Sequence, residues 1–109
     1  MKKIEIIELP KIYDPRGSLT VAEENTHIPF DIKRMEWIHL GAIQPETPME
    51  LGESPVMLIA LAGEITIQIM EEGTLKLTRP NQALILREAC KSSIIDSTEH
   101  SLLLTIHQK

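Results

Sequence analysis

Residues 56–78 read VMLIALAGEITIQIMEEGTLKLT, and this stretch decides the fold class of the chain. Its first six residues are apolar without interruption, which is typical of a strand that is buried on both faces. Residues 64–70 then alternate between apolar and polar, so that Ile65, Ile67 and Ile69 share one face. Glu72 and Gly73 fit a hairpin turn before a further strand at 74–78. The stretch therefore predicts antiparallel strands joined by tight turns.

The same signals continue in both directions along the chain. Short apolar or alternating segments, bounded by Gly, Pro or Asn, predict further strands at 4–9, 18–22, 33–40, 83–86, 93–95 and 102–106. Residues 42–55 hold three prolines and one glycine, which predicts a long loop or a loosely paired excursion that borders a site. No segment has a convincing helical period. Eight or nine short strands without helices predict an all-β sandwich or barrel.

The composition limits the classes of function. With 109 residues, 42% of them hydrophobic and 25% charged, the chain fits a single domain spanning residues 1–109. Its formal net charge of −5 and its scattered basic residues offer no positive stripe for a phosphate backbone, so we expect no nucleic-acid partner. The charged amino terminus and the lack of an apolar run of about 18 residues argue against a signal peptide and a membrane span. We expect a cytoplasmic protein without a membrane partner.

Several sequence blocks carry a resemblance to a known family. The blocks are DPRGSL at 14–19, VAEEN at 21–25 and IPFDIKR at 28–34, followed by LIALAG at 58–63 and Arg79-Pro80. In these blocks the chain resembles the dTDP-sugar 3,4-ketoisomerases, the WxcM-like or FdtA-like cupins. The resemblance covers residues 4–87.

The resemblance implies a fold, an activity and an assembly. The fold would be a cupin-like β-barrel, an RmlC-like jelly roll. The family's enzymes move a keto group between C3 and C4 of a dTDP-linked 4-keto-6-deoxyhexose, a step associated with polysaccharide biosynthesis. The resemblance also implies a homodimer and a dTDP-sugar ligand, without a cofactor. Pairing between subunits would protect the open edges of a small barrel.

Three side chains in the resembling region are candidate ligand contacts. Arg16 and Arg34 would be suited to hold a pyrophosphate on the barrel rim, because a guanidinium binds phosphate bidentately. Trp37 would stack on a base or sugar. For two of them a structural role is the simpler interpretation: Arg16 fits a stabilising residue of its turn, and Trp37 fits the core or a subunit interface beside Met35.

The histidine pair on which the family's chemistry depends is missing. The family carries Arg-Gly-x-His-x-His before the block at 58–63, and counting back places the two histidines at Met49 and Leu51. A 3,4-keto shift passes through an enediol, so one group must remove a proton and another must return one. A thioether and an alkyl side chain do neither. The sequence also departs from the family at residues 87–91.

Other titratable side chains are the candidates for a replacement base or a metal site. Glu36 is a candidate base if the barrel interior raises its pKa, but the simpler interpretation is an ion pair with Arg34 on the same strand face, or solvent exposure. His27, His39, His100 and His107 lack the spacing of a metal site, and we interpret them as surface or strand-end residues, with no metal expected. Cys90, the single cysteine, is interpreted as a structural thiol.

Two main hypotheses follow from these observations. The first is a non-catalytic or strongly diverged member of the family, a cupin that binds a nucleotide sugar or acts as a regulatory or partner subunit. The alternative is an active sugar-nucleotide isomerase or epimerase with replacement acid–base residues such as Glu36, Tyr13 or a histidine from a partner subunit. A purely structural role is the third possibility.

Overall fold

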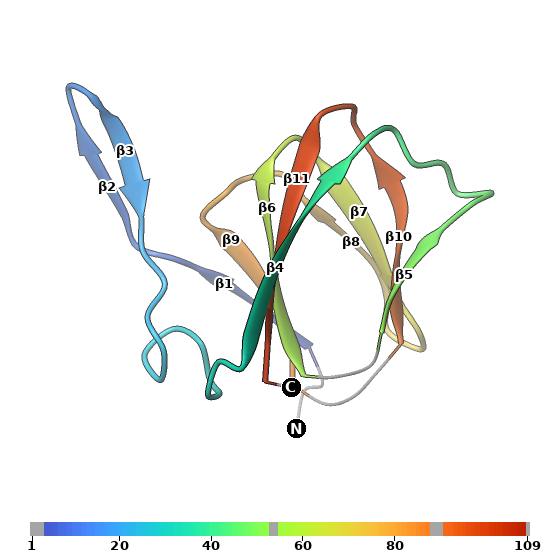
Figure 1. Ribbon diagram of the computed structural model, residues 1–109, viewed down its shortest axis with the longest axis horizontal. Helices are drawn as coiled ribbons and strands as arrows, with labels where there is room; N and C mark the ends of the chain where they lie inside the picture. The colour runs from blue at the N-terminus through green and yellow to red at the C-terminus, as the bar shows by residue number, and fades with distance from the viewer. Residues whose placement is uncertain (1–3, 53–54, 88–90, 109) are drawn as a thin grey trace.

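The chain folds into two antiparallel sheets that pack face to face, with a separate hairpin beside them (Figure 1). The computed structural model describes residues 4–52, 55–87 and 91–108. The first sheet consists, in spatial order, of β1 (Ile4–Glu8), β9 (Gln82–Leu86), β6 (Val56–Ala62), β11 (Ser101–His107) and β4 (Arg34–Leu40). The second consists of β5 (Met49–Gly52), β10 (Ser92–Ser97), β7 (Ile65–Ile69) and β8 (Gly73–Leu77). The hairpin pairs β2 (Lys11–Asp14) with β3 (Gly17–Thr20).

The space between the two sheets holds the main core. Ile65, Ile67 and Ile69 on β7 are fully buried, as their alternation predicts, and they belong to one cluster with Leu58 and Ala60 on β6. Burying an aliphatic side chain of this size stabilises the fold by about 1.5–3 kcal/mol. The alternating residues of both sheets therefore hold the sandwich together.

The five-stranded sheet is apolar on its outer face as well. Met57 and Ile59 point away from the main core and pack in a second cluster with Ile28 and Phe30, which lie in the segment between β3 and β4. Because this segment covers the sheet, β6 is buried on both sides from Val56 to Ala60. This arrangement explains the uninterrupted apolar run at the start of residues 56–78.

The predicted all-β architecture is confirmed, but two strands were not predicted as such. The described residues form eleven strands, more than the eight or nine expected. β5 lies within the proline-rich segment 42–55 and is held only by irregular pairing with β10, so its sequence carries little strand signal. β2 follows directly after Pro10, in a stretch where no strand was predicted. Cys90 lies outside the described residues. None of the described segments forms a helix that could span a membrane.

The β2–β3 hairpin stands apart from the sandwich (Figure 1). Its two strands pair with each other and with no other strand of the described chain. Ile12 and Tyr13 are largely exposed on it, and the Lys11 ammonium lies 5.1 Å from the centroid of the Tyr13 ring. An isolated two-stranded hairpin is at best marginally stable in water. The hairpin therefore exposes apolar surface that no other described segment covers.

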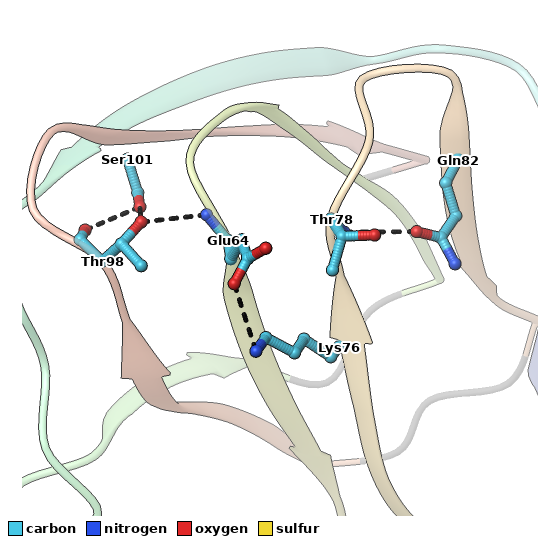
Figure 2. Close-up of polar contacts among 6 residues, drawn as sticks. All are labelled: Glu64, Lys76, Thr78, Gln82, Thr98 and Ser101. Atoms are coloured by element: carbon cyan, nitrogen blue, oxygen red, sulfur yellow. Dashed lines mark hydrogen bonds and ion pairs between the residues drawn. The ribbon is translucent and has the colours of Figure 1, made fainter.

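Side-chain hydrogen bonds close one end of the sandwich (Figure 2). The Ser101 hydroxyl donates to the Thr98 carbonyl oxygen at 2.7 Å, and the Thr98 hydroxyl oxygen accepts from the Glu64 backbone N–H at 3.0 Å. The Glu64 carboxylate in turn pairs with Lys76 at 3.1 Å. Gly63 precedes these residues with a φ of +74°, and a Cβ there would collide with both hydroxyl oxygens. The turn therefore needs glycine for both its backbone conformation and its close approach.

We expect Gly63→Ala to destabilise the protein by about 2–4 kcal/mol, because it adds left-handed backbone strain to a steric clash. Gly41→Ala is the matched control, since a Cβ at Gly41 meets no atom within 4 Å. Urea unfolding followed by tryptophan fluorescence and circular dichroism measures both changes. Equal midpoints for the two variants would contradict this account of the turn.

Candidate functional site

A small polar cluster interrupts the apolar lining between the two sheets. It consists of Arg34 and Glu36 on β4 and of Thr105 and His107 on β11. The register of these strands places Arg34 opposite His107 and Glu36 opposite Thr105. Because Leu103 belongs to the main core, strand alternation directs Thr105 and His107 to the same side. The polar cluster therefore lies on the inner face of the five-stranded sheet.

One carboxylate connects the members of the polar cluster. Glu36 Oε1 lies 3.5 Å from Arg34 Nε and 3.2 Å from His107 Nε2. His107 Nε2 also lies 2.9 Å from the Thr105 hydroxyl oxygen, and that hydroxyl is 3.4 Å from the Glu36 carbonyl oxygen, to which it donates. This pattern fits the tautomer with hydrogen on Nε2, which the carboxylate and the hydroxyl oxygen share as acceptors. The buried imidazole of His107 thus orients the Glu36 carboxylate through this hydrogen bond.

Burial differs sharply within the polar cluster. His107 is only 5% exposed, whereas the side chains of Arg34 and Glu36 are each about half exposed, at 55% and 51%. Burial lowers the pKa of the His107 imidazole below its ordinary value of 6.5, and the Arg34 guanidinium lowers that pKa further. The charge of Glu36 and its hydrogen bond act in the opposite direction and raise this pKa. The net result is a neutral, buried imidazole behind an accessible carboxylate.

The structure bears differently on the two sequence interpretations that concern this cluster. The interpretation of Glu36 as a partner of Arg34 on one strand face is confirmed. The interpretation of His107 as a surface or strand-end residue is half wrong, because it ends β11 but is buried. Alternation from Leu103 through Thr105 would have placed His107 inside. The contact with Glu36 depends on the pairing of β11 with β4, which the sequence alone does not reveal.

The inner face of β5, the edge strand of the four-stranded sheet near β4, is apolar. Met49 and Leu51 alternate on β5, the edge strand of the four-stranded sheet, while β4 is an edge of the five-stranded sheet. Leu51 packs against the main core, and Met49 is 38% exposed. β8 lies against β9 on the other side of the sandwich, so β4 and β5 are edges of the same side (Figure 1). That Met49 and Leu51 replace family histidines stays a prediction.

The remaining candidate ligand contacts do not converge within one chain. Trp37 lies opposite Leu104 on the outer face of β4, where it is 62% exposed, and Met35 beside it is also exposed. Trp37 therefore points away from Arg34. The interpretation of Trp37 as a core residue is wrong, and its place in a subunit interface stays a prediction. Arg16 lies in the turn between β2 and β3, at the end of the hairpin that projects from the sandwich (Figure 1). Only Arg34 of the three lies on the inner face.

A hollow of about 480 Å³ lies at another place, beside the β7–β8 turn and the start of β10. Its lining includes Glu50, Glu71 and Lys91, but no member of the polar cluster. Two carboxylates against one ammonium make this hollow unfavourable for a diphosphate. Nowhere in residues 4–52, 55–87 and 91–108 do three His, Cys, Asp or Glu side chains come together as metal ligands would.

Comparison with known protein families gives a match over almost the whole chain. The family model described as FdtA: WxcM-like, C-terminal matches residues 2–109. A curated protein, the TDP-4-oxo-6-deoxy-alpha-D-glucose-3,4-oxoisomerase of Aneurinibacillus thermoaerophilus, is 53% identical over 34 residues. That stretch covers 31% of this chain and 24% of the curated relative, so it spans about a quarter of that protein.

Solved structures of similar proteins confirm the expected fold class. A double mutant of the QdtA 3,4-ketoisomerase of Thermoanaerobacterium thermosaccharolyticum, in complex with TDP, has a TM-score of 0.84 and 27% identity, covering 100% of this chain and 82% of that chain. A histidine-to-asparagine mutant of QdtA, in complex with TDP-4-keto-6-deoxyglucose, has a TM-score of 0.81 and 26% identity, covering 100% of this chain and 82% of that chain. The WlaRB TDP-quinovose 3,4-ketoisomerase of Campylobacter jejuni has a TM-score of 0.84 and 26% identity, covering 100% of this chain and 87% of that chain.

The lowered pKa of His107 predicts a pH-dependent stability. The unfolded chain binds a proton near pH 6.5, whereas native His107 binds it only at lower pH, so the free energy of unfolding falls as the pH drops from 6.5 through the lowered pKa. His107→Gln keeps an N–H donor and removes this proton linkage. Urea unfolding at pH about 7.5 and about 5.5 compares the two proteins. An equal loss of stability in both would show that His107 does not contribute.

Proposed function

Since the chain belongs to the FdtA family, described as WxcM-like, C-terminal, we propose that it binds a TDP-linked sugar and has lost the family's histidine-dependent 3,4-keto shift. The observation that carries this proposal is the placement of Arg34 on the inner face of the sandwich, on the side where β5 offers only Met49 and Leu51. The ligand class comes from the QdtA complexes, which contain TDP or TDP-4-keto-6-deoxyglucose. The protein would act as a binding, regulatory or partner subunit.

Arg34 supports the binding half of the proposal. Its side chain is half exposed, and its contact with Glu36 at 3.5 Å is an exposed ion pair. Such a pair contributes about 0–1 kcal/mol, so a diphosphate can compete for the guanidinium at small cost. The planar group would then hold two phosphate oxygens at once. Arg16 and Trp37 stay candidate contacts, but they require surfaces that a single chain does not bring to Arg34.

The apolar β5 edge supports the loss of the keto shift. Isomerisation of a 4-keto sugar to a 3-keto sugar needs a proton acceptor at C3 and a proton donor at C4. Met49 and Leu51 have neither acidic nor basic atoms, and the outward residue between them, Glu50, faces solvent. We infer that the family's transfer of the keto group therefore does not proceed on this edge.

We also propose that the protein is a homodimer. The β2–β3 hairpin exposes Ile12 and Tyr13, and the outer face of β4 exposes Met35 and Trp37 beside an unpaired strand edge. Unpaired edges and apolar surfaces of this kind favour association, and a second copy of the same chain offers both surfaces at once. The first partner of this chain would then be a second copy of itself.

Arg34→Gln should weaken TDP binding about 10- to 100-fold, because it removes a charge-assisted contact to phosphate. Arg79→Gln is the matched control, since Arg79 is an equally exposed arginine paired with Glu8 at 3.0 Å. Glu8 lies on β1, at the edge of the five-stranded sheet opposite β4. Isothermal titration calorimetry with TDP measures both affinities. Unchanged affinity in Arg34→Gln would remove the observation on which the ligand site rests.

Light scattering coupled to size-exclusion chromatography should give the mass of a dimer, about twice 12.3 kDa. Trp37→Glu places a charge on the outer face of β4 and should shift the protein toward the monomer. Met70→Glu is the control, because Met70 is a comparably exposed apolar residue in the turn that follows β7. A monomeric wild-type protein would contradict the proposed assembly.

A further inference from the structure

The polar cluster combines an accessible carboxylate with a buried imidazole behind it. Glu36 is about half exposed on the inner face, while His107 is 5% exposed and contacts the same carboxylate oxygen at 3.2 Å. Around them, Val56 and Leu103 are fully or almost fully buried apolar residues. A histidine in such surroundings is desolvated and needs hydrogen-bond partners, and Glu36 and Thr105 supply them.

We infer that Glu36 is a general base that removes a proton from the carbon next to the keto group of the bound sugar, and that His107 positions it. This inference rests on the proposed binding of a 4-keto nucleotide sugar beside Arg34. It assigns to the chain a proton-exchange activity that does not use the positions predicted for the family's histidines. Glu36 is the catalytic residue in this scheme, because its carboxylate is the group that reaches the ligand.

The step balances without a co-reactant. The carbon–hydrogen bond next to the keto group breaks, its electron pair forms a carbon–carbon double bond, and the keto oxygen becomes an enolate oxygen. The proton moves to a Glu36 carboxylate oxygen, where it exchanges with solvent because the side chain is half exposed. Returning a solvent-derived proton to the same carbon restores the 4-keto sugar. Return to the opposite face of that carbon would give an epimer instead.

His107 and Arg34 support this step in different ways. The Nε2–H of His107 fixes the orientation of the carboxylate, and its neutral state leaves the carboxylate free to accept a proton. Arg34, which holds the diphosphate in the proposed complex, fixes the sugar beside Glu36. The β5 edge contributes no acid at the neighbouring carbon. The expected outcome is hydrogen exchange without movement of the keto group.

Proton NMR of TDP-4-keto-6-deoxyglucose in D2O tests this inference. With the wild-type protein, a signal of a hydrogen next to the keto group should decay faster than in protein-free buffer, and no 3-keto product should appear. Glu36→Gln should slow the protein-dependent exchange by about 100-fold or more, because an amide does not accept the proton. Glu50→Gln on the outer face of β5 is the matched control and should exchange like wild type.

The role of His107 needs a readout that a structural role would not change. His107→Leu fills the buried position without a donor and should lower the maximal exchange rate about tenfold while the affinity for TDP is unchanged. His107→Gln restores an N–H near the same place and should recover most of that rate. Equal rates in both variants, or a parallel loss of TDP affinity, would overturn the positioning role. His39→Asn, on the outer face of β4, is the control.

The failure of this inference is distinguishable from the failure of the proposed function. If calorimetry shows TDP binding while the sugar hydrogens do not exchange above the protein-free rate, the base assignment is wrong and the binding function stands. If Glu36→Gln exchanges like wild type, another group is the base and the inference is overturned. If TDP does not bind and exchange is absent, both are wrong. A 3-keto product would contradict the lost keto shift alone.

Discussion

The position of β11 between β4 and β6 is the constraint on which the rest of this structure depends. β11 pairs with β4 along its whole length and with β6 from Leu102 to His107, so it links the edge of the five-stranded sheet to the buried centre. Its inner residues continue the main core through Leu103 and then change character at Thr105 and His107. The strand therefore brings polar atoms into an apolar interior at the one place where β4 offers Arg34 and Glu36 as partners.

The electrostatic balance of the site follows from this placement. Burial favours the neutral imidazole of His107, and the guanidinium of Arg34 works in the same direction. Glu36 opposes both, but half of its side chain is in contact with solvent, which weakens its influence. A histidine that stays neutral holds its hydrogen bond to the carboxylate without cancelling the negative charge there. The arrangement keeps one acidic and one basic side chain accessible to a ligand.

Sequence reasoning reached the fold more easily than the site. The alternation of Ile65, Ile67 and Ile69 and the run at 56–61 identify buried strands, because the period of two is a direct consequence of strand geometry. β5 was missed as a regular strand because its residues are poor strand formers held by their neighbours. The ion pair of Glu36 with Arg34 was accessible because both lie on one strand. The contact with His107 was not, because it joins residues 71 positions apart through sheet register.

The two apolar faces of the five-stranded sheet have a consequence for how the chain finds its register during folding. In a sheet with one wet face, a slip by one residue exposes the core side chains, and the hydrophobic effect alone rejects it. For β6 a slip would exchange one apolar set for another, since Met57 and Ile59 are as buried as Leu58 and Ala60. The hydrophobic effect therefore discriminates poorly between pairings at the centre of this sheet. Selection of the native pairing falls to the few polar residues on β11, because a shifted Thr105 and His107 would lose their hydrogen bonds inside an apolar layer.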